Sequence, residues 1–167
     1  MMNSEIEHWA RKLGALLTAR GLMATTAESC TGGGVAYAIT EISGSSAWFD
    51  RSFVTYTNAA KSQMLGVPVE LIETHGAVSE QVVQAMALGA LKRSDAQIAV
   101  ALSGVAGPGG GSATKPVGLV WMAWAWQWPG NEASGCISEA CHFPGDRSSV
   151  RQQAIIKALQ TMCKLIQ

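Results

Sequence analysis

Apolar residues recur along the chain at steps of three and four, which is the spacing of one face of a helix. The first such set is followed by Gly21 as a helix stop, and two later sets follow Ser79 and Asp146 as helix starts. The sequence therefore predicts three long amphipathic helices. Their apolar faces are Ile6, Trp9, Leu13, Leu16 and Leu17; Val82, Val83, Met86 and Ala90; and Ile155, Leu159, Met162 and Ile166.

Other segments have the pattern of strands. Residues 96–107 form a near-continuous apolar run, which is typical of a strand covered on both faces. Residues 48–57 are rich in aromatic and β-branched types. Further strands are predicted at 22–28, 117–127 and 135–143, with a turn in WPGNEASG, residues 128–135, between the last two.

Shorter helices complete the order of elements. One is predicted from Thr31 to about Ile39, one from Asn58 as its N-cap to Leu65, and one opening at Pro68. The order is α, β, α, β, short helices, α, β, β, β, α, which supplies helices for both faces of one mixed sheet. We therefore predict a single three-layer α/β/α domain over residues 1–167.

Composition and charge narrow the class of ligand. Hydrophobic residues make up 48% of the chain and charged residues 14%, as in a compact globular protein. The 12 basic and 12 acidic residues cancel without a run of like charge, so we expect a small-molecule substrate and no nucleic acid. A signal peptide and a membrane-length apolar run are not recognisable, which predicts a cytoplasmic protein without a membrane segment. The cysteines and histidines lack metal-ligand spacing, so neither a metal nor a cofactor is expected.

The most reactive side chains lie in TTAESCTGGGVA, residues 25–36, where Ser29 and Cys30 stand between a predicted strand and a predicted helix. Unpaired N–H groups at such a junction would stabilise a serine alkoxide and the oxyanion of a tetrahedral intermediate. Ser29 is therefore a candidate nucleophile. The same place is an ordinary N-cap position, and a helix cap is the alternative interpretation.

A serine nucleophile needs a base, and the sequence has neither a G-x-S-x-G elbow nor a histidine in a recognisable triad context. The segment VTYTNAAK, residues 54–61, offers Tyr56 at a strand end and Lys61 in the first turn of the next helix. If the two strands run parallel, these side chains and Ser29 share one edge of the sheet. The helix dipole would lower the pKa of a lysine there toward the range of a general base; a solvated surface lysine is the alternative.

A glycine-rich loop, residues 103–118, follows the buried strand. Its backbone N–H groups lie where α/β folds usually place a ligand crevice, which predicts a cradle for phosphate or carboxylate. The loop contains neither standard nucleotide-binding fingerprint, and a plain flexible loop is the alternative.

Several motifs occur together in order: AESCTGG, GSSAWFDRSFVTYTNAAK, GAVS, SGVAGPGG with PVG, and FPGDRSSVR. Over about residues 5–166 the chain resembles the CinA C-terminal domain family, which includes stand-alone nicotinamide-nucleotide amidases. The resemblance implies hydrolysis of nicotinamide mononucleotide to nicotinic acid mononucleotide and ammonia. It matches the family's nucleophile to Ser29, and its tyrosine and lysine to Tyr56 and Lys61. Ser103 replaces an expected threonine and Ser52 an expected glycine, which bears on substrate preference more than on the chemistry.

The resemblance also implies a homodimer. By their position the loop Gly104–Gly110, Gly32 and Gly33, and Arg147 or Arg151 are candidates for binding the substrate's phosphate. The residues predicted to contact the substrate are Cys30, Thr31, Gly32, Gly33, Asn58, Ser103, Gly104, Ala106, Gly107, Pro108, Gly109, Gly110 and Arg147.

In the expected mechanism Ser29 attacks the carboxamide carbon while neutral Lys61, directly or through Tyr56, takes its proton. Helix N–H groups hold the oxyanion, and water then hydrolyses the acyl-enzyme. Two alternatives stay open: Cys30 as the nucleophile, and a non-catalytic domain that binds a ligand or a partner.

Trp124, Trp126 and Trp128 alternate along one predicted strand. This pattern predicts packing in the core, with a dimer interface or stacking on a pyridinium ring as the alternatives.

Overall fold

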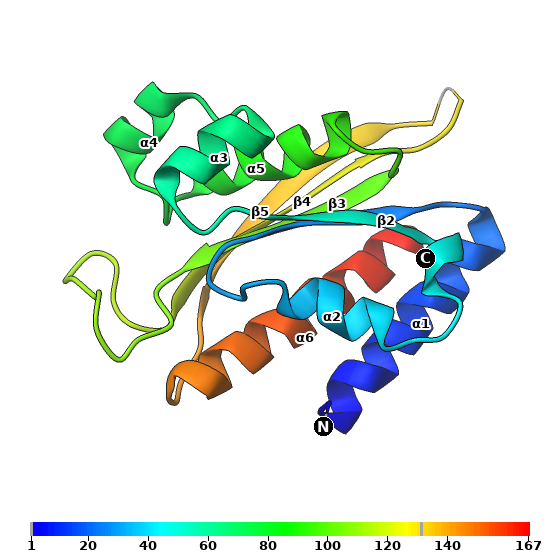
Figure 1. Cartoon of the computed structure of the whole chain (residues 1–167), viewed down its shortest axis with the longest axis horizontal. Coiled ribbons are helices and arrows are strands. Elements are labelled where there is room, and N and C mark those ends of the chain that lie inside the picture. The colour runs from blue at the N-terminus through cyan, green and yellow to red at the C-terminus, as the bar shows by residue number, and fades with distance from the viewer. Residues whose placement is uncertain (1, 131) are drawn as a thin grey trace.

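The computed structural model describes residues 2–130 and 132–167. The order of helices and strands is the predicted one (Figure 1). Of the turn predicted at 128–135, Asn131 lies outside the described residues. Within the described residues, no helix combines the length and the apolar composition needed to cross a membrane. The elements are α1 (Ser4–Arg20), β1 (Ala24–Glu28), α2 (Gly34–Thr40), the 3-10 helix η1 (Ser45–Ala47), β2 (Phe49–Val54), α3 (Asn58–Leu65), α4 (Val69–His75), α5 (Glu80–Lys92), β3 (Ile98–Gly104), β4 (Leu119–Gln127), β5 (Ser134–His142) and α6 (Arg147–Ile166).

The strands form one mixed sheet in the order β2-β1-β3-β4-β5. Strand β1 is parallel to β2 and β3, whereas β4 is antiparallel to both β3 and β5. From the carboxyl end of β1 the chain goes on to β2, and from that of β3 it goes to β4 on the other side. The carboxyl ends of β1 and β3 therefore form a topological switch point, where open α/β sheets bind their ligands.

Figure 1 shows the sheet between two helical layers, with α3, α4 and α5 on one face and α1, α2 and α6 on the other. The central strands present small side chains to α5 and large ones to α1 and α6. Small side chains let α5 lie close to the sheet, and large ones fill the other layer. The predicted three-layer α/β/α fold is confirmed. The small side chains are Ala27, Ala99, Ala101, Ala123 and Ala125, and the large ones include Val100, Leu102, Met122 and Trp124.

Trp124 belongs to this core, as predicted. It is buried, and its Nε1 donates to the carbonyl oxygen of Ala158 at 3.2 Å. Trp126 and Trp128 are partly buried and stack on each other with ring centroids 6.4 Å apart. The start of β4 lies beside the switch point. Trp124 and Trp126 lie in the second half of β4 and Trp128 directly after it, so all three are distant from the carboxyl ends of β1 and β3.

The element ends lie within three residues of the predictions. The strand predicted at 48–57 ends at Val54, so Tyr56, which was expected at the strand end, lies beyond it. Gly21 ends α1 in the left-handed conformation, as predicted. The helix expected from Thr31 begins later, at Gly34, because Gly32 and Gly33 have φ of 59° and 97°. Asn58 is not an N-cap but the first residue of α3; the side chain of Thr57 accepts from the N–H of Ala60 instead.

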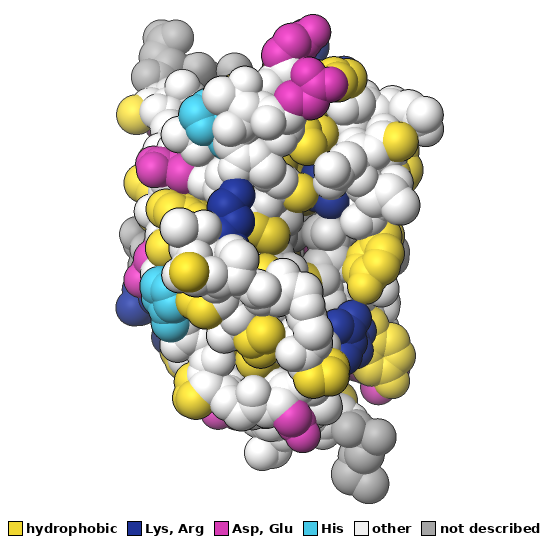
Figure 2. Space-filling model, turned by 90° about the vertical axis from the view of Figure 1, so that its left-hand side faces the viewer, with side chains coloured by type: hydrophobic (Ala, Val, Ile, Leu, Met, Phe, Trp, Pro, Cys, Tyr) yellow, Lys and Arg dark blue, Asp and Glu magenta, His cyan; other side chains and the backbone are white. Residues whose placement is uncertain are grey.

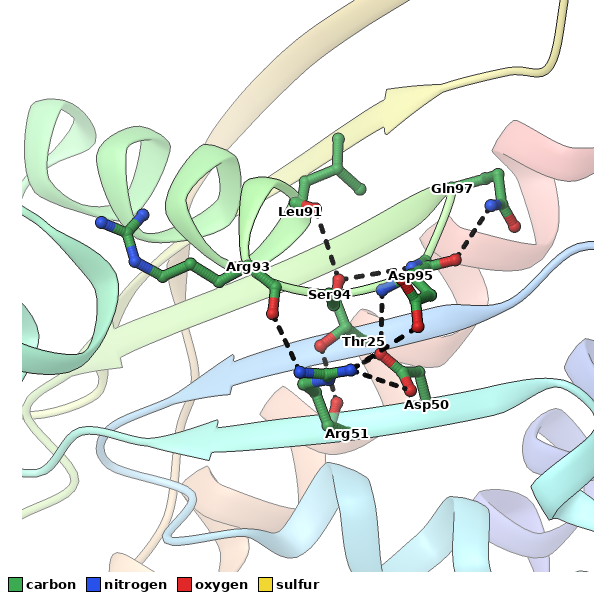
Figure 3. A network of polar contacts seen from close by, with 9 residues as sticks. Thr25, Asp50, Arg51, Leu91, Arg93, Ser94, Asp95 and Gln97 are labelled. Atoms are coloured by element: carbon green, nitrogen blue, oxygen red, sulfur yellow. Dashed lines mark hydrogen bonds and ion pairs between the residues drawn. The ribbon is translucent and has the colours of Figure 1, made fainter.

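Polar contacts tie the edge strand β2 to the segment after α5 (Figure 3). Arg51 pairs with Asp50 at 2.7 Å and donates to the carbonyl oxygen of Arg93 at 3.2 Å. Asp50 accepts from the N–H of Asp95, and the hydroxyl of Thr25 donates to the carbonyl oxygen of Arg51. The hydrogen bond from Arg51 lowers the pKa of Asp50. These contacts hold the amino-terminal half of β2 in place. After the carboxyl end of β2 the chain continues into α3, which carries Lys61.

Candidate active site

Ser29 directly follows β1 at the switch point. Its N–H donates to the carbonyl oxygen of Leu102 on β3 at 3.0 Å, and the carbonyl oxygen of Glu28 accepts from the N–H of Thr55 at 2.9 Å. Both neighbouring strands therefore hold the backbone around Ser29. Figure 2 looks onto this end of the molecule, where Lys and Arg side chains lie beside a hollow in the surface.

Lys61 comes from α3 and is almost completely buried, so the alternative of a solvated surface lysine is wrong. Its Nζ lies 3.1 Å from Ser29 Oγ, 2.9 Å from the carbonyl oxygen of Thr55 and 3.4 Å from that of Tyr56. In the described part of the chain, no carboxylate forms an ion pair with it. Burial lowers the pKa of Lys61. A neutral amine can also satisfy these contacts, by donating to the two carbonyls and accepting from the Ser29 hydroxyl.

Cys30 is buried beside Ser29. Burial raises the pKa of its thiol to about 11, so the thiol is protonated at neutral pH. A thiol is a much weaker nucleophile than a thiolate. The structure therefore favours Ser29 over Cys30 as the attacking group.

Tyr56 contributes to the site mainly through its backbone. Its carbonyl oxygen lies 3.4 Å from Lys61 Nζ and 3.5 Å from Ser29 Oγ. Its side chain is 60% exposed, and its hydroxyl accepts from Arg147 at 3.2 Å. Among the described residues, no hydrogen bond joins this hydroxyl to Ser29 or Lys61, so the geometry does not provide the expected proton relay through Tyr56.

A cavity of about 210 Å³ lies over Ser29 and Lys61. It adjoins a cavity of about 460 Å³, and Ala106 and Arg147 line both. Ala77 and Val78 also line the smaller cavity but were not predicted as site residues; the GAVS motif that contains them was the available signal. The predicted residues that line the smaller cavity are Ser29, Cys30, Tyr56, Asn58, Lys61, Ser103, Gly104, Ala106 and Arg147.

The other predicted contacts lie elsewhere. Pro108 lines the larger of these two cavities, while Gly107, Gly109 and Gly110 line neither. Thr31, Gly32 and Gly33 line a separate cavity of about 300 Å³, because the chain turns away from Lys61 after Cys30.

The two candidate arginines make defined contacts instead of pointing into solvent. Arg147, at the start of α6, donates to the carbonyl oxygen of Gly107 at 2.7 Å as well as to the Tyr56 hydroxyl. Arg151 donates to the carbonyl oxygens of Cys30 and Thr31 at 3.1 and 3.2 Å. Arg147 thus lines both cavities, and Arg151 supports residues 29–33, which we term the nucleophile turn.

The N–H groups of α2, which the sequence analysis assigned to the oxyanion, are already engaged. Those of Val35 and Ala36 donate to the carboxylate of Glu28, and that of Gly34 donates to the carbonyl oxygen of Thr31. These three N–H groups are therefore not free to hold the oxyanion, and an oxyanion site at the earlier residues of the turn stays a prediction. Sequence reasoning also missed Glu28, because no capping rule spaces a carboxylate so far before the helix that it caps.

Residues 6–166 match the family model described as the CinA C-terminal domain. A protein of Escherichia coli K12 named nicotinamide-nucleotide amidohydrolase PncC is 54% identical over 162 residues, which cover 97% of this chain and 95% of that protein. A protein of the same name from Pseudomonas putida is 52% identical and covers 93% and 94%. The crystal structure of the competence/damage inducible protein CihA from Agrobacterium tumefaciens superposes with a TM-score of 0.95 at 47% identity, covering 100% and 99% of the two chains.

Proposed function

Because the chain belongs to the CinA C-terminal domain family, we propose that it is an amidase that converts nicotinamide mononucleotide to nicotinic acid mononucleotide and ammonia. Relatives that are more than half identical over almost their whole length are named nicotinamide-nucleotide amidohydrolase. The observation that carries the proposal is the distance of 3.1 Å between Ser29 Oγ and the buried Lys61 Nζ. A serine and a lysine in this contact form a nucleophile and its base.

In the first half of the reaction, neutral Lys61 takes the hydroxyl proton of Ser29 as Oγ bonds to the carboxamide carbon. The resulting ammonium is stabilised by the carbonyl oxygens of Thr55 and Tyr56, which already lie within hydrogen-bond distance. Lys61 then gives the proton to the amide nitrogen, the carbon–nitrogen bond breaks and ammonia leaves.

In the second half, water replaces ammonia. Lys61, again neutral, takes a proton from the water as its oxygen attacks the acyl carbon, and returns it to Ser29 Oγ when the ester bond breaks. The products are the nicotinate nucleotide and the free enzyme. Water supplies the new carboxyl oxygen and the proton that returns to Ser29.

The nucleotide extends across the two adjoining cavities. The pyridine ring occupies the smaller one next to Ser29, and the ribose phosphate reaches past Arg147 into the larger one. The guanidinium of Arg147 and the backbone near Pro108 supply donors for the phosphate. Replacement of Arg147 by alanine should therefore reduce the preference for the mononucleotide over the nucleoside that lacks the phosphate.

The test of the proposed function is an assay of the purified protein with nicotinamide mononucleotide, in which both products are identified by mass spectrometry. We expect turnover by the wild type, loss of turnover in Ser29→Ala, and no change in Ser94→Ala, which removes a hydroxyl at the opposite end of the sheet. Turnover that survives in Ser29→Ala would exclude the serine mechanism, and an inactive wild type would favour the non-catalytic alternative. A homodimer and a cytoplasmic location stay predictions.

A further inference from the structure

Glu28 is completely buried at the carboxyl end of β1, directly before Ser29. Its Oε1 accepts from the Thr31 hydroxyl at 2.7 Å and from the N–H of Val35 at 2.9 Å. Its Oε2 accepts from the N–H of Ala36 at 3.0 Å. The carboxylate thus binds the first turn of α2 and the middle of the nucleophile turn together.

Hydroxyl groups of two strands complete the surroundings of Glu28. Thr26 Oγ1 on β1 lies 3.1 Å from Oε2, and Ser52 Oγ on the neighbouring β2 lies 3.5 Å from it. These two hydroxyls are 2.6 Å apart. The carboxylate therefore accepts hydrogen bonds from the nucleophile turn, from α2 and from hydroxyls of β1 and β2.

The place of these contacts in the chain matters for the nucleophile. Glu28 stands before the nucleophile turn and α2 after it, so one side chain joins both ends of the turn that carries Ser29. On the main chain, Glu28 accepts from the N–H of Thr55, whose own carbonyl oxygen accepts from Lys61 Nζ. Glu28 therefore contacts the segment of the nucleophile and the segment that holds its base.

We propose that Glu28 is a positioning residue for the hydrolysis. Its carboxylate fixes the nucleophile turn so that Ser29 Oγ stays within hydrogen-bond distance of Lys61 Nζ. Glu28 does not line the cavity over Ser29, so it acts through the turn and not on the substrate. The inference rests on the proposed function insofar as Ser29 is the nucleophile.

Glu28→Gln tests the role at nearly constant volume. The amide has one acceptor oxygen, and in either orientation its NH2 group faces the N–H of Val35 or of Ala36, so one of them loses its acceptor. Thr31→Val is a milder second variant that removes one donor to the carboxylate and tests the same contact if Glu28→Gln does not fold. Ile98→Val is the control, because Ile98 is buried at the opposite end of β3 from the site.

Two measurements are made on each variant. In steady-state kinetics on nicotinamide mononucleotide, we expect kcat of Glu28→Gln to fall by about tenfold or more while KM changes by less than about threefold, because the nucleophile is displaced but the substrate contacts remain. In hydrogen exchange followed by mass spectrometry without substrate, we expect exchange in residues 29–36 to accelerate about tenfold while the other segments keep their protection. Thr31→Val should show both effects at smaller size, and Ile98→Val should lower Tm with kcat unchanged.

A wild-type kcat in Glu28→Gln, or exchange that accelerates equally along the whole chain, would overturn the positioning role. The exchange experiment uses no substrate and so separates the two proposals. If the wild type does not hydrolyse the nucleotide but Glu28→Gln still releases residues 29–36, the proposed function fails while the control of the turn by Glu28 is supported.

Discussion

Three oxygen atoms surround the nitrogen of Lys61, and they belong to Ser29, Thr55 and Tyr56. An ammonium group would donate a hydrogen to each of them, whereas a neutral amine donates to the two carbonyls and accepts from the hydroxyl. The same contacts therefore serve both protonation states, and burial shifts the balance toward the neutral one. This property suits a group that gains and loses a proton in every cycle.

The pH dependence of the reaction tests this assignment. We expect kcat/KM to rise with pH through an ionisation whose pKa lies below 10.5, the ordinary lysine value, because only the neutral amine can take the proton of Ser29. The arginine in Lys61→Arg stays charged, so kcat/KM of this variant should be about three orders of magnitude or more below that of the wild type across this range. A rate that falls as Lys61 loses its proton would contradict the assignment.

Stability should follow the same ionisation. The pKa of Lys61 is lower in the folded state, so the unfolded chain binds more protons between the folded and the unfolded pKa. The contribution of Lys61 to stability is therefore complete above the unfolded value and is lost as pH falls through the folded one. Between the two pKa values, the free energy of unfolding should therefore rise more steeply with pH for the wild type than for Lys61→Met. Urea unfolding at several pH values measures both slopes.

Cys30 offers a separate test of the nucleophile. With a thiol pKa of about 11, the residue is protonated at neutral pH, so Cys30→Ala should retain kcat within about threefold of the wild type. Iodoacetamide at neutral pH should leave activity unchanged for the same reason. Loss of turnover in Cys30→Ala together with full activity in Ser29→Ala would show that the Cys30 sulfur is the nucleophile.

The sequence predicted that Ser29 and Lys61 lie together, but not the contacts that hold them in place. Ser29 and Lys61 could be paired because each follows a strand that ends at the same edge of the sheet. The catalytic role expected for the Tyr56 hydroxyl stays a prediction, whereas the contacts of its carbonyl oxygen with Lys61 and Ser29 depend on the backbone path and were not predictable from the residue type. Glu28 gave no signal, since its N–H donors lie seven and eight residues further along the chain.

At the scale of elements, the position of α3 depends on its packing against α5. A Cβ added to Gly89 of α5 would overlap the carbonyl oxygen of Leu65, the last residue of α3. The glycine lets the two helices approach closely, and α3 carries Lys61 into the sheet edge. Sequence patterns predicted both helices but not this contact, because it depends on the distance between them.

Gly89→Ala should therefore destabilise the protein by about 1–3 kcal/mol through overpacking. The direction of the change in unfolding free energy is informative, because without the close contact alanine would stabilise the helix by about 1 kcal/mol relative to glycine. Urea unfolding measures the change, and Leu88→Ala, at a half-exposed neighbouring position of the same helix, should stay within about 0.5 kcal/mol of the wild type. An unchanged or raised stability of Gly89→Ala would refute the close packing.

At the scale of the whole molecule, the two helical layers share one sheet. Consecutive residues of β3 belong to opposite layers: Ala99 and Ala101 face α5, and Val100 and Leu102 face the other side. Because both faces of β3 are buried, this alternation of faces appears in the sequence only as an unbroken apolar run, which predicted three layers. The order of strands was not predictable in the same way, because it is set by the crossovers and not by any local pattern.

This sharing of strands predicts one cooperative unfolding transition. Neither layer can lose its apolar contacts without exposing the sheet side of the other, so calorimetry should give a single peak whose calorimetric and van't Hoff enthalpies agree. Two resolved peaks, or a van't Hoff enthalpy well below the calorimetric one, would show that the layers melt independently.

The proposed nucleophile and its proposed base reach the site from opposite sides of the sheet: Glu28 and α2 hold Ser29 from one layer, and α3 carries Lys61 from the other. Turnover consequently reports whether the two layers are in register. Because the two layers share one sheet, activity and the circular dichroism signal should be lost together on heating or in denaturant.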